Sequence, residues 1–287
     1  MVLIVKETPI VIQGITGRQG SFHTETMLKY GTNIVAGVTP GKGGQTAHNL
    51  PVYNSVYEAV DNHNVKASVV FVPAKFAKDA VIEGIQAGLE TIVVITEGIP
   101  VRDTLEMIAK AEDQACIIGP NTAGMLVPPI QAKLGIMPND LCSPGPISVI
   151  TKSGTLSYEI SKSLDLAEFG LANYLGIGGD PIRGSTFVDM LQLLDNDPET
   201  KQVVLIGEIG GDEEENAAEF IKEHFSKPVF AYVAGKSAPE GKRMGHAGAI
   251  ISGESGTAQT KIKALQAANA IVADSPWDIA SLIRDQT

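Results

Sequence analysis

Cysteine, targeting segments and long apolar runs are scarce or missing in this sequence. The two cysteines, Cys116 and Cys142, have no C-x-x-C spacing, so they supply neither a disulfide framework nor a zinc site, which suits a reducing compartment. No run of about 18 apolar residues could span a bilayer. Residues 1–12 lead directly into an expected strand, without a signal or Arg-rich transit sequence. We therefore expect a cytoplasmic protein with no metal ligands of its own.

Basic residues are outnumbered by acidic ones. The chain has 22 Lys and Arg against 33 Asp and Glu, which gives a formal net charge of −11. Neither nucleic acid nor an anionic membrane is an expected partner, because both attract proteins through clustered positive charge. The pattern G-x-x-x-x-G-K-[ST] is also missing, so we expect no P-loop for ATP in this chain.

Short runs rich in Val and Ile alternate with segments of helical period, which predicts an α/β fold built from βαβ units around parallel sheets. The length suffices for two domains, and the Pro-rich stretch at residues 125–146 marks the expected boundary. We predict a Rossmann-like domain over residues 1–125 and a flavodoxin-like, doubly wound parallel-sheet domain over residues 126–287. The expected strands are residues 10–13, 34–38, 68–72, 91–95 and 116–118, then 147–151, 174–177, 203–206, 229–233 and 271–273.

A glycine-rich turn, Gly14-Ile-Thr-Gly17-Arg-Gln-Gly20, follows the first expected strand and precedes a helix expected from about Ser21. The N–H groups of a helix N-terminus can hold phosphate oxygens. NAD sites use G-x-G-x-x-G and carry Asp or Glu after the second strand, where this chain has Lys42 within a glycine-rich loop. A lysine there suits a ribose phosphate, as in coenzyme A (CoA) or NADP. Two alternatives remain open: the glycine-rich turn could serve only to pack the helix on the strand, and Lys42 could be an ordinary surface lysine.

His246 lies between glycines after the strand expected at residues 229–233. Glycines leave the ring uncrowded, and a neutral imidazole is a competent nucleophile near pH 7. Glu208 follows another strand, and a carboxylate bonded to one ring nitrogen fixes the tautomer. Since parallel strands end at one sheet edge, we expect the two side chains to meet. A loop histidine without chemistry and a capping glutamate are the plain alternatives.

A second turn of small residues, Ser153-Gly-Thr155, follows the strand expected at residues 147–151 and opens a helix that carries Tyr158 and Glu159. Its first N–H groups form an anion site at the same sheet edge. The acidic run at residues 212–215 is expected to open another helix, complement its dipole and face solvent.

Over essentially its whole length the chain resembles the α subunits of succinate–CoA ligases, also called succinyl-CoA synthetases. The matching segments are Gln13-Gly-Ile-Thr-Gly17, Gly37-Val-Thr-Pro-Gly-Lys-Gly-Gly44, Ile95-Thr-Glu-Gly-Ile-Pro100, Gly119-Pro-Asn121, Ser153-Gly-Thr-Leu156, Gly176-Ile-Gly-Gly-Asp-Pro181, Ile206-Gly-Glu-Ile-Gly-Gly211 and Gly241-Lys-Arg-Met-Gly-His-Ala-Gly-Ala-Ile250.

The resemblance implies an acid–thiol ligase that makes succinyl-CoA through succinyl phosphate. It implies that CoA is bound by Thr16, Gly17, Arg18, Gln19, Lys42, Ile95, Thr96 and Glu97. It also implies that His246 is transiently phosphorylated beside Glu208, that Ser153, Gly154 and Thr155 hold the phosphoryl group, and that Tyr158 lies near the organic acid. The implied partner is a β subunit whose ATP-grasp domain binds Mg²⁺ and ATP or GTP, in an αβ or (αβ)2 assembly.

The chain departs from the family at residues 121–124, which read Asn-Thr-Ala-Gly where the family usually has Asn-Cys-Pro-Gly. This segment is expected close to where thiol and acid meet, so a malate–CoA ligase α subunit with the same chemistry is an alternative. Two alternatives come from other classes. An NADP-dependent oxidoreductase would share the first domain but would not need His246 and Glu208, and a CoA-binding module without catalysis would lack one of them.

Overall fold

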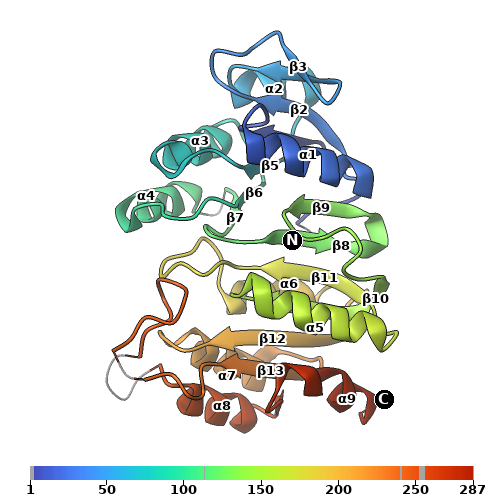
Figure 1. Ribbon diagram of the computed structural model, residues 1–287, viewed down its shortest axis with the longest axis vertical. Coiled ribbons are helices and arrows are strands. Elements are labelled where there is room, and N and C mark those ends of the chain that lie inside the picture. Colours follow the sequence, from blue (N-terminus) through green and yellow to red (C-terminus); the bar gives the residue numbers. More distant parts are fainter. Residues whose placement is uncertain (1–2, 113, 240, 252–255, 287) are drawn as a thin grey trace. The chain divides into compact units, whose positions relative to one another are not determined.

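The computed structural model of the chain describes residues 3–112, 114–239, 241–251 and 256–286 (Figure 1). The chain forms two compact units. The first comprises Met1–Leu126, Ile130–Asn139 and Ile182–Gly184, and the second comprises Val127–Pro129, Asp140–Pro181 and Ser185–Thr287. The first uninterrupted segment ends next to the boundary expected at residue 125, and two short later segments return to the first unit.

The first unit contains a mainly parallel sheet with strand order β3-β4-β2-β1-β5-β6-β7. Its strands are β1 (Ile10–Gln13), β2 (Ile34–Val38), β3 (Thr46–Ala47), β4 (Leu50–Tyr53), β5 (Ala67–Val70), β6 (Thr91–Val94) and β7 (Cys116–Ile118). Among the described strands of this sheet, the short β3 alone runs antiparallel, against β4. Without β3 the order is 3-2-1-4-5-6, which is that of the Rossmann fold. The predicted Rossmann-like topology is confirmed.

Helices pack around this first sheet. They are α1 (Arg18–Tyr30), α2 (Val56–His63), α3 (Ala74–Gln86) and α4 (Val101–Ala111). Helix α3 packs against both α2 and α4, whereas α1 packs against β9 (Ala132–Gly135), which follows β8 (Gly124–Val127). Every residue of β1, β5 and β6 is buried, as expected for parallel strands covered on both faces.

The second unit holds five parallel strands in the order β14-β13-β12-β10-β11. They are β10 (Pro144–Thr151), β11 (Leu171–Gly176), β12 (Gln202–Glu208), β13 (Val229–Ala234) and β14 (Ile271–Val272). Read from the other edge, the order is 2-1-3-4-5, the order of flavodoxin-like folds. This prediction is confirmed as well.

Helices form two rows around the second sheet. They are α5 (Gly154–Leu166), α6 (Phe187–Asp195), α7 (Glu213–His224), α8 (Ala258–Ala267) and α9 (Ile279–Arg284). Helix α5 packs with α9, while α7 packs with both α6 and α8. In Figure 1 α5 lies in front of the strands and α6 and α7 lie behind them, so the sheet is doubly wound.

Some expected bounds were wrong. Helix α1 begins at Arg18 instead of Ser21, because Gly17 already has the extended backbone of an N-cap residue. Strand β12 continues through Glu208, which pairs with Ala234 of β13. Strands β4, β8 and β9 were not expected, because proline or glycine interrupts their apolar patterns. Strand β3 was not expected because it has only two residues.

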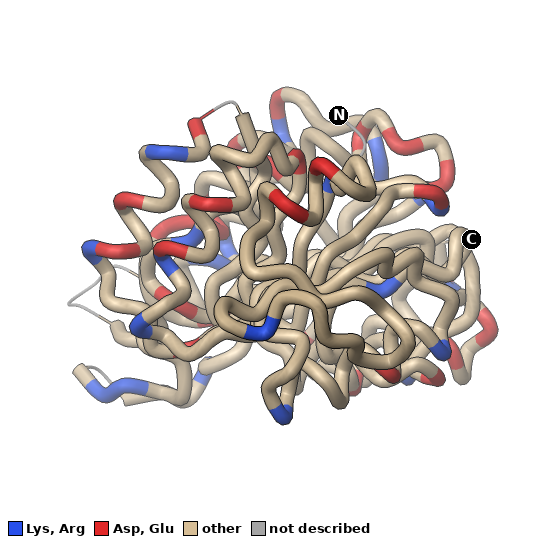
Figure 2. Tube along the Cα trace, turned by 90° about the horizontal axis from the view of Figure 1, so that it is seen from above, with Lys and Arg blue, Asp and Glu red and all other residues tan. Residues whose placement is uncertain are grey.

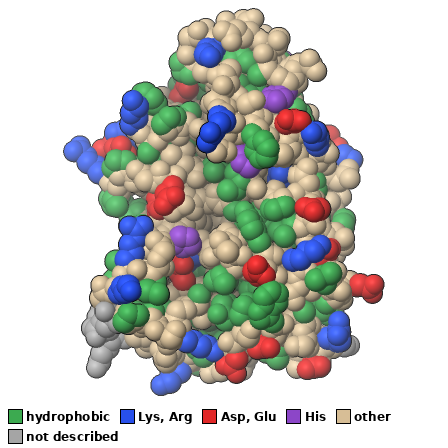
Figure 3. Space-filling model, in the orientation of Figure 1, with side chains coloured by type: hydrophobic (Ala, Val, Ile, Leu, Met, Phe, Trp, Pro, Cys, Tyr) green, Lys and Arg blue, Asp and Glu red, His purple; other side chains and the backbone are tan. Residues whose placement is uncertain are grey.

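Charged residues of both signs are distributed along the chain trace (Figure 2), and they are interspersed with apolar side chains on the face seen in Figure 3. Across the described residues, no helix has the length and apolarity needed to cross a membrane.

Candidate active site

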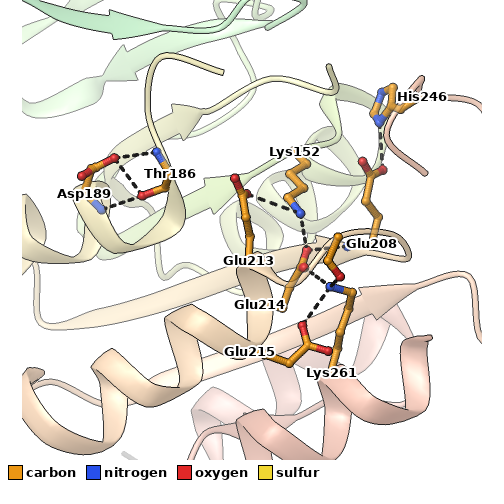
Figure 4. A network of polar contacts seen from close by, with 10 residues as sticks. Lys152, Thr186, Asp189, Glu208, Glu213, Glu214, Glu215, His246 and Lys261 are labelled. Carbon is orange, nitrogen blue, oxygen red and sulfur yellow. Dashed lines mark hydrogen bonds and ion pairs between the residues drawn. The ribbon is translucent and has the colours of Figure 1, made fainter. Parts of the chain in front are cut away.

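The second unit brings His246 and Glu208 into direct contact. The Nδ1 atom of His246 lies 2.8 Å from Oε2 of Glu208 (Figure 4). The two side chains are 29% and 11% exposed, so the pair is shielded from bulk water yet open to a reactant. A carboxylate at Nδ1 holds the proton on that nitrogen and orients the ring for chemistry at Nε2.

This contact lies where ligands collect in folds of this kind. In a 2-1-3-4-5 sheet the order reverses between the first and third strands, and the crevice lies at their carboxyl ends. Here these strands are β10, which leads to Lys152 and Ser153, and β12, which ends with Glu208. The N–H of Lys152 donates to the carbonyl of Ile206 at 3.4 Å, which places the turn after β10 beside the end of β12.

The imidazole of His246 packs directly on the backbone of Gly179. A Cβ atom at Gly179 would lie 2.5 Å from Cγ of the ring, closer than any real Cβ contact. Gly179 follows β11 in the segment Gly176-Ile-Gly-Gly-Asp-Pro181. The contact of Gly179 with the ring of His246 was not predicted, because a single sequence does not indicate which glycines touch a distant side chain.

Helix α5 begins beside the same edge. Ser153 is its N-cap, and the Ser153 hydroxyl accepts a hydrogen bond from the N–H of Leu156 at 3.4 Å. The first turn contains Gly154 and Thr155, so small side chains surround the positive end of the helix dipole. Tyr158 lies one turn further along and is half-buried. Burial raises the pKa of its phenol, which keeps the hydroxyl protonated and able to donate at neutral pH.

The acidic run that opens α7 does not form the solvated face that the sequence suggested. Glu214 is fully buried between two lysines, with Lys152 Nζ at 2.8 Å from its Oε1 and Lys261 Nζ at 2.5 Å from its Oε2. Glu213 and Glu215, partly exposed, also pair with these lysines (Figure 4). The prediction failed because helical spacing aims one residue of an acidic run inward, and only the tertiary fold supplies its partners.

Burial on its own would raise the pKa of Glu214, but Lys152 and Lys261 outweigh it and hold that pKa below its usual value. A depressed carboxyl pKa stabilises the fold at neutral pH, and this contribution is lost as the pH falls through the folded-state pKa.

The first unit places the glycine-rich turn at the end of β1. Gly14 has a φ of 87°, and a Cβ at Gly20 would lie 2.2 Å from the carbonyl oxygen of Gly14, so turn and helix are in backbone contact. Gly17 caps α1 without a side-chain hydrogen bond. Gly17, Arg18 and Gln19 are exposed. This leaves an uncrowded helix N-terminus suited to phosphate oxygens.

Two further segments end at the same edge of the first sheet. Lys42 is exposed in the loop after β2, where Oδ1 of Asn54 accepts hydrogen bonds from the N–H groups of Gly41 and Gly43 at 2.9 Å each. Asn54 was not foreseen, because asparagine is common in turns of every kind. The hydroxyl of Thr16 donates to that of Thr39 at 3.1 Å, tying the glycine turn to this loop.

Ile95, Thr96 and Glu97 follow β6, and the Thr96 hydroxyl donates to the carbonyl of Val72 at 2.7 Å. Glu97 is exposed. Thr122, from the segment that departs from the family, is buried, and its hydroxyl accepts from the N–H of Gly124 at 2.9 Å. The threonine at this position therefore stabilises the local turn through its own side chain.

Comparisons with known proteins agree over both units. The family described as CoA binding domain matches residues 5–98, and the family described as CoA-ligase matches residues 150–271. An ADP-forming succinate–CoA ligase subunit alpha 2 of Archaeoglobus fulgidus is 55% identical over 287 residues, which cover 99% of both chains. A malate–CoA ligase subunit alpha of Methylorubrum extorquens is 45% identical, covering 99% of this chain and 97% of the relative.

Among solved structures, ATP citrate lyase from Methanothrix soehngenii, in complex with citrate and coenzyme A, superposes with a TM-score of 0.90 at 26% identity. The match covers 99% of this chain and 50% of the lyase chain. This chain therefore spans about half the length of that enzyme.

Proposed function

The chain belongs to the family of succinate–CoA ligase α subunits, and we propose that it binds CoA in its first unit and carries a phosphoryl group on His246 in its second. Residues 1–125 then form the CoA-binding domain and residues 126–287 the ligase domain. The contact of 2.8 Å between His246 Nδ1 and Glu208 Oε2 carries this proposal. It supplies an oriented nucleophile at the strand edge where helix α5 begins.

The reaction needs an activated acid. A carboxylate does not accept a thiolate until one of its oxygens becomes a good leaving group, and an acyl phosphate provides one. In the first step the lone pair of His246 Nε2 attacks the γ-phosphorus of the nucleotide, the bond to the bridging oxygen breaks, and the nucleoside diphosphate leaves. Glu208 keeps the proton on Nδ1 throughout and stabilises the positive charge that develops on the ring.

In the second step a carboxylate oxygen of the acid attacks the phosphorus and the N–P bond breaks, which restores the imidazole. The thiolate of CoA then attacks the acyl carbon, and inorganic phosphate leaves. Ser153, Gly154 and Thr155 at the start of α5 are suited to hold the phosphoryl oxygens, because the helix dipole favours negative charge there. The protonated phenol of Tyr158 is suited to donate to the acid.

CoA requires anion contacts in the first unit. Thr16, Gly17, Arg18 and Gln19 surround the N-terminus of α1, Lys42 supplies a cation after β2, and Ile95, Thr96 and Glu97 border the same edge after β6. Helix N-H groups and a lysine match a pyrophosphate and a ribose phosphate.

A β subunit completes the enzyme in this proposal. Its ATP-grasp domain would bind ATP or GTP together with Mg²⁺, which neutralises phosphate charge during transfer, and the two subunits would assemble as αβ or (αβ)2. Succinate is the proposed acid. Malate is the second candidate, because a malate–CoA ligase subunit alpha is 45% identical to this chain.

Labelling of the chain tests the function. With a β subunit, Mg²⁺ and γ-labelled ATP or GTP, the label should appear on this chain, survive alkali and be lost in acid, as expected for a phosphoramidate. Succinate and CoA should then discharge it. An acid-stable label, or one that succinate and CoA cannot remove, would contradict the proposed function.

Lys42→Glu should weaken CoA binding by about 1 to 3 kcal/mol, because a charge-assisted contact to phosphate is replaced by repulsion. Calorimetry should show a smaller loss for dephospho-CoA, which lacks the ribose phosphate. Lys110→Glu, an exposed lysine in the last turn of α4, is the matched control and should leave the affinity unchanged. Tighter binding of NAD than of CoA would refute the assignment of the first unit.

Glu208→Gln should retain the fold but slow phosphorylation of His246 by about 10²-fold or more, because an amide neither holds the tautomer nor stabilises the charged ring. Rapid-quench measurement of label transfer provides the rate. Glu219→Gln, an exposed position on α7, controls for the loss of one negative charge. A rate within twofold of the unmodified chain would show that Glu208 does not act on the ring.

A further inference from the structure

We propose that Glu214 is a positioning residue for the His246–Glu208 pair, since its buried carboxylate fixes the peptide group that carries the Glu208 side chain. Oε1 of Glu214 accepts a hydrogen bond from the backbone N–H of Glu208 at 3.1 Å. The inference rests on the proposed function of His246 and deepens it, because Glu214 itself does not touch the histidine.

The carboxylate of Glu214 is held from both sides. Lys152 Nζ lies 2.8 Å from Oε1, and Lys261 Nζ lies 2.5 Å from Oε2. Both Glu214 and Lys261 have fully buried side chains. Figure 4 shows the Lys152–Glu214–Lys261 chain of contacts beside the Glu208–His246 pair, with Lys152 to its left and Lys261 at the lower end. With an ionic partner at each oxygen, the carboxylate has little freedom to rotate away from Glu208.

The same cluster fixes both ends of the turn that follows β12. Glu214 binds the N–H of Glu208, and Lys261 donates to the carbonyl of Gly211 at 2.9 Å. A Cβ at Gly207 would lie 2.6 Å from Cγ of Glu214, so the Glu214 side chain crosses directly over the backbone that precedes Glu208. The buried ionic cluster of Lys152, Glu214 and Lys261, called the charged frame below, therefore holds the chain from Glu208 to Gly211 from one side.

The frame also reaches the phosphate-binding turn. Lys152, whose side chain is 5% exposed, immediately precedes Ser153, the N-cap of α5. One carboxylate therefore links the segment that carries the acid partner of His246 to the segment proposed to receive the phosphoryl group. Phosphoryl transfer depends mainly on positioning and electrostatic stabilisation, so a loss of register between these segments should slow it.

Helix stabilisation alone does not account for this arrangement. Glu213 and Glu215 already place negative charge in the first turn of α7, and buried ion pairs are weak contributors to net stability because of their desolvation. What distinguishes Glu214 is its hydrogen bond to the Glu208 peptide.

The test compares Glu214→Gln, Glu214→Asp and the matched control Glu215→Gln. Glu215 pairs with the same Lys261, at 3.0 Å. Two quantities are measured in each folded variant: the rate of His246 phosphorylation with the β subunit, Mg²⁺ and labelled ATP or GTP, and the ring tautomer of His246 by ¹⁵N NMR. The His246 signals are assigned by their loss in His246→Ala. CoA affinity and thermal unfolding report on the rest of the fold.

Both Glu214 variants should slow phosphorylation by about ten- to a hundredfold, in line with the loss of outer-shell partners elsewhere, and should replace the single Nδ1–H tautomer by a mixture. Glu214→Asp keeps the negative charge but has a side chain that is one methylene shorter. It therefore distinguishes the effect of the charge from the effect of side-chain length, and it replaces Glu214→Gln in the test if that variant does not fold. Glu215→Gln should stay within twofold, and CoA affinity should not change in any variant.

A wild-type rate in the Glu214 variants would overturn the inference. So would slowing with an unchanged ring tautomer, or equal slowing in Glu215→Gln, because each would indicate a general structural role. If the unmodified chain is never labelled, the proposed function of His246 fails, whereas the tautomer comparison still decides whether Glu214 positions the pair.

Discussion

His246→Ala should abolish both the labelling of this chain and the turnover of succinate and CoA in the presence of a β subunit. Alanine offers no nucleophile, and the proposed route passes the phosphoryl group through the imidazole before it reaches the acid. Chromatographic separation of the subunits after incubation with labelled nucleotide measures the first effect, and succinyl-CoA formation measures the second.

His224→Ala is the matched control, because His224 is an exposed histidine of the same unit, at the C-terminal end of α7. It should be labelled and should turn over like the unmodified chain. Label retained in His246→Ala would place the phosphoryl group on another residue, and turnover retained without label would remove the phosphohistidine from the pathway.

The isolated chain should show no measurable ligase turnover, and addition of a β subunit should restore it fully. The sequence has no P-loop, and the relative that is 55% identical is named as one subunit of a ligase. A coupled assay of nucleoside diphosphate release over a titration of β subunit measures the effect, which should saturate at a defined ratio of subunits.

The control for this experiment is a β subunit mixed with His246→Ala, which should bind without restoring turnover. With the unmodified chain, succinate should be turned over in preference to malate. Full ATP- or GTP-dependent activity from the rigorously purified chain alone would contradict the proposal that the β subunit binds the nucleotide.

Much of the fold could be predicted because each signal is local. The runs at residues 10–12 and 34–38 are apolar and lie within β1 and β2, as expected for buried parallel strands. The strand orders followed from βαβ alternation combined with the short list of doubly wound topologies. Strands β4, β8 and β9 escaped prediction because Pro51, Gly124 and Gly135 interrupt their apolar patterns, and β3 escaped because it is only two residues long.

The candidate site divides in the same way. His246, Glu208 and the turn at Ser153 could be placed at one sheet edge from sequence, because strand order fixes which carboxyl ends are neighbours. The contact of Gly179 with the His246 ring and the hydrogen bonds of Asn54 to the loop of Lys42 could not be predicted from sequence. Both depend on segments that are distant from each other in the chain.

The sequence by itself determined which residue types are available for the proposed chemistry: a histidine as the proposed phosphoryl acceptor, a carboxylate to orient it, and turns of small residues proposed to hold phosphates. Only the tertiary structure decided which charges lie inside. Glu214 reads as one member of an exposed acidic run, yet it is buried between Lys152 and Lys261, which lie 62 residues before it and 47 residues after it. Burial depends on three-dimensional neighbours, and an ionised carboxylate is tolerated in the interior only where such neighbours compensate its lost hydration.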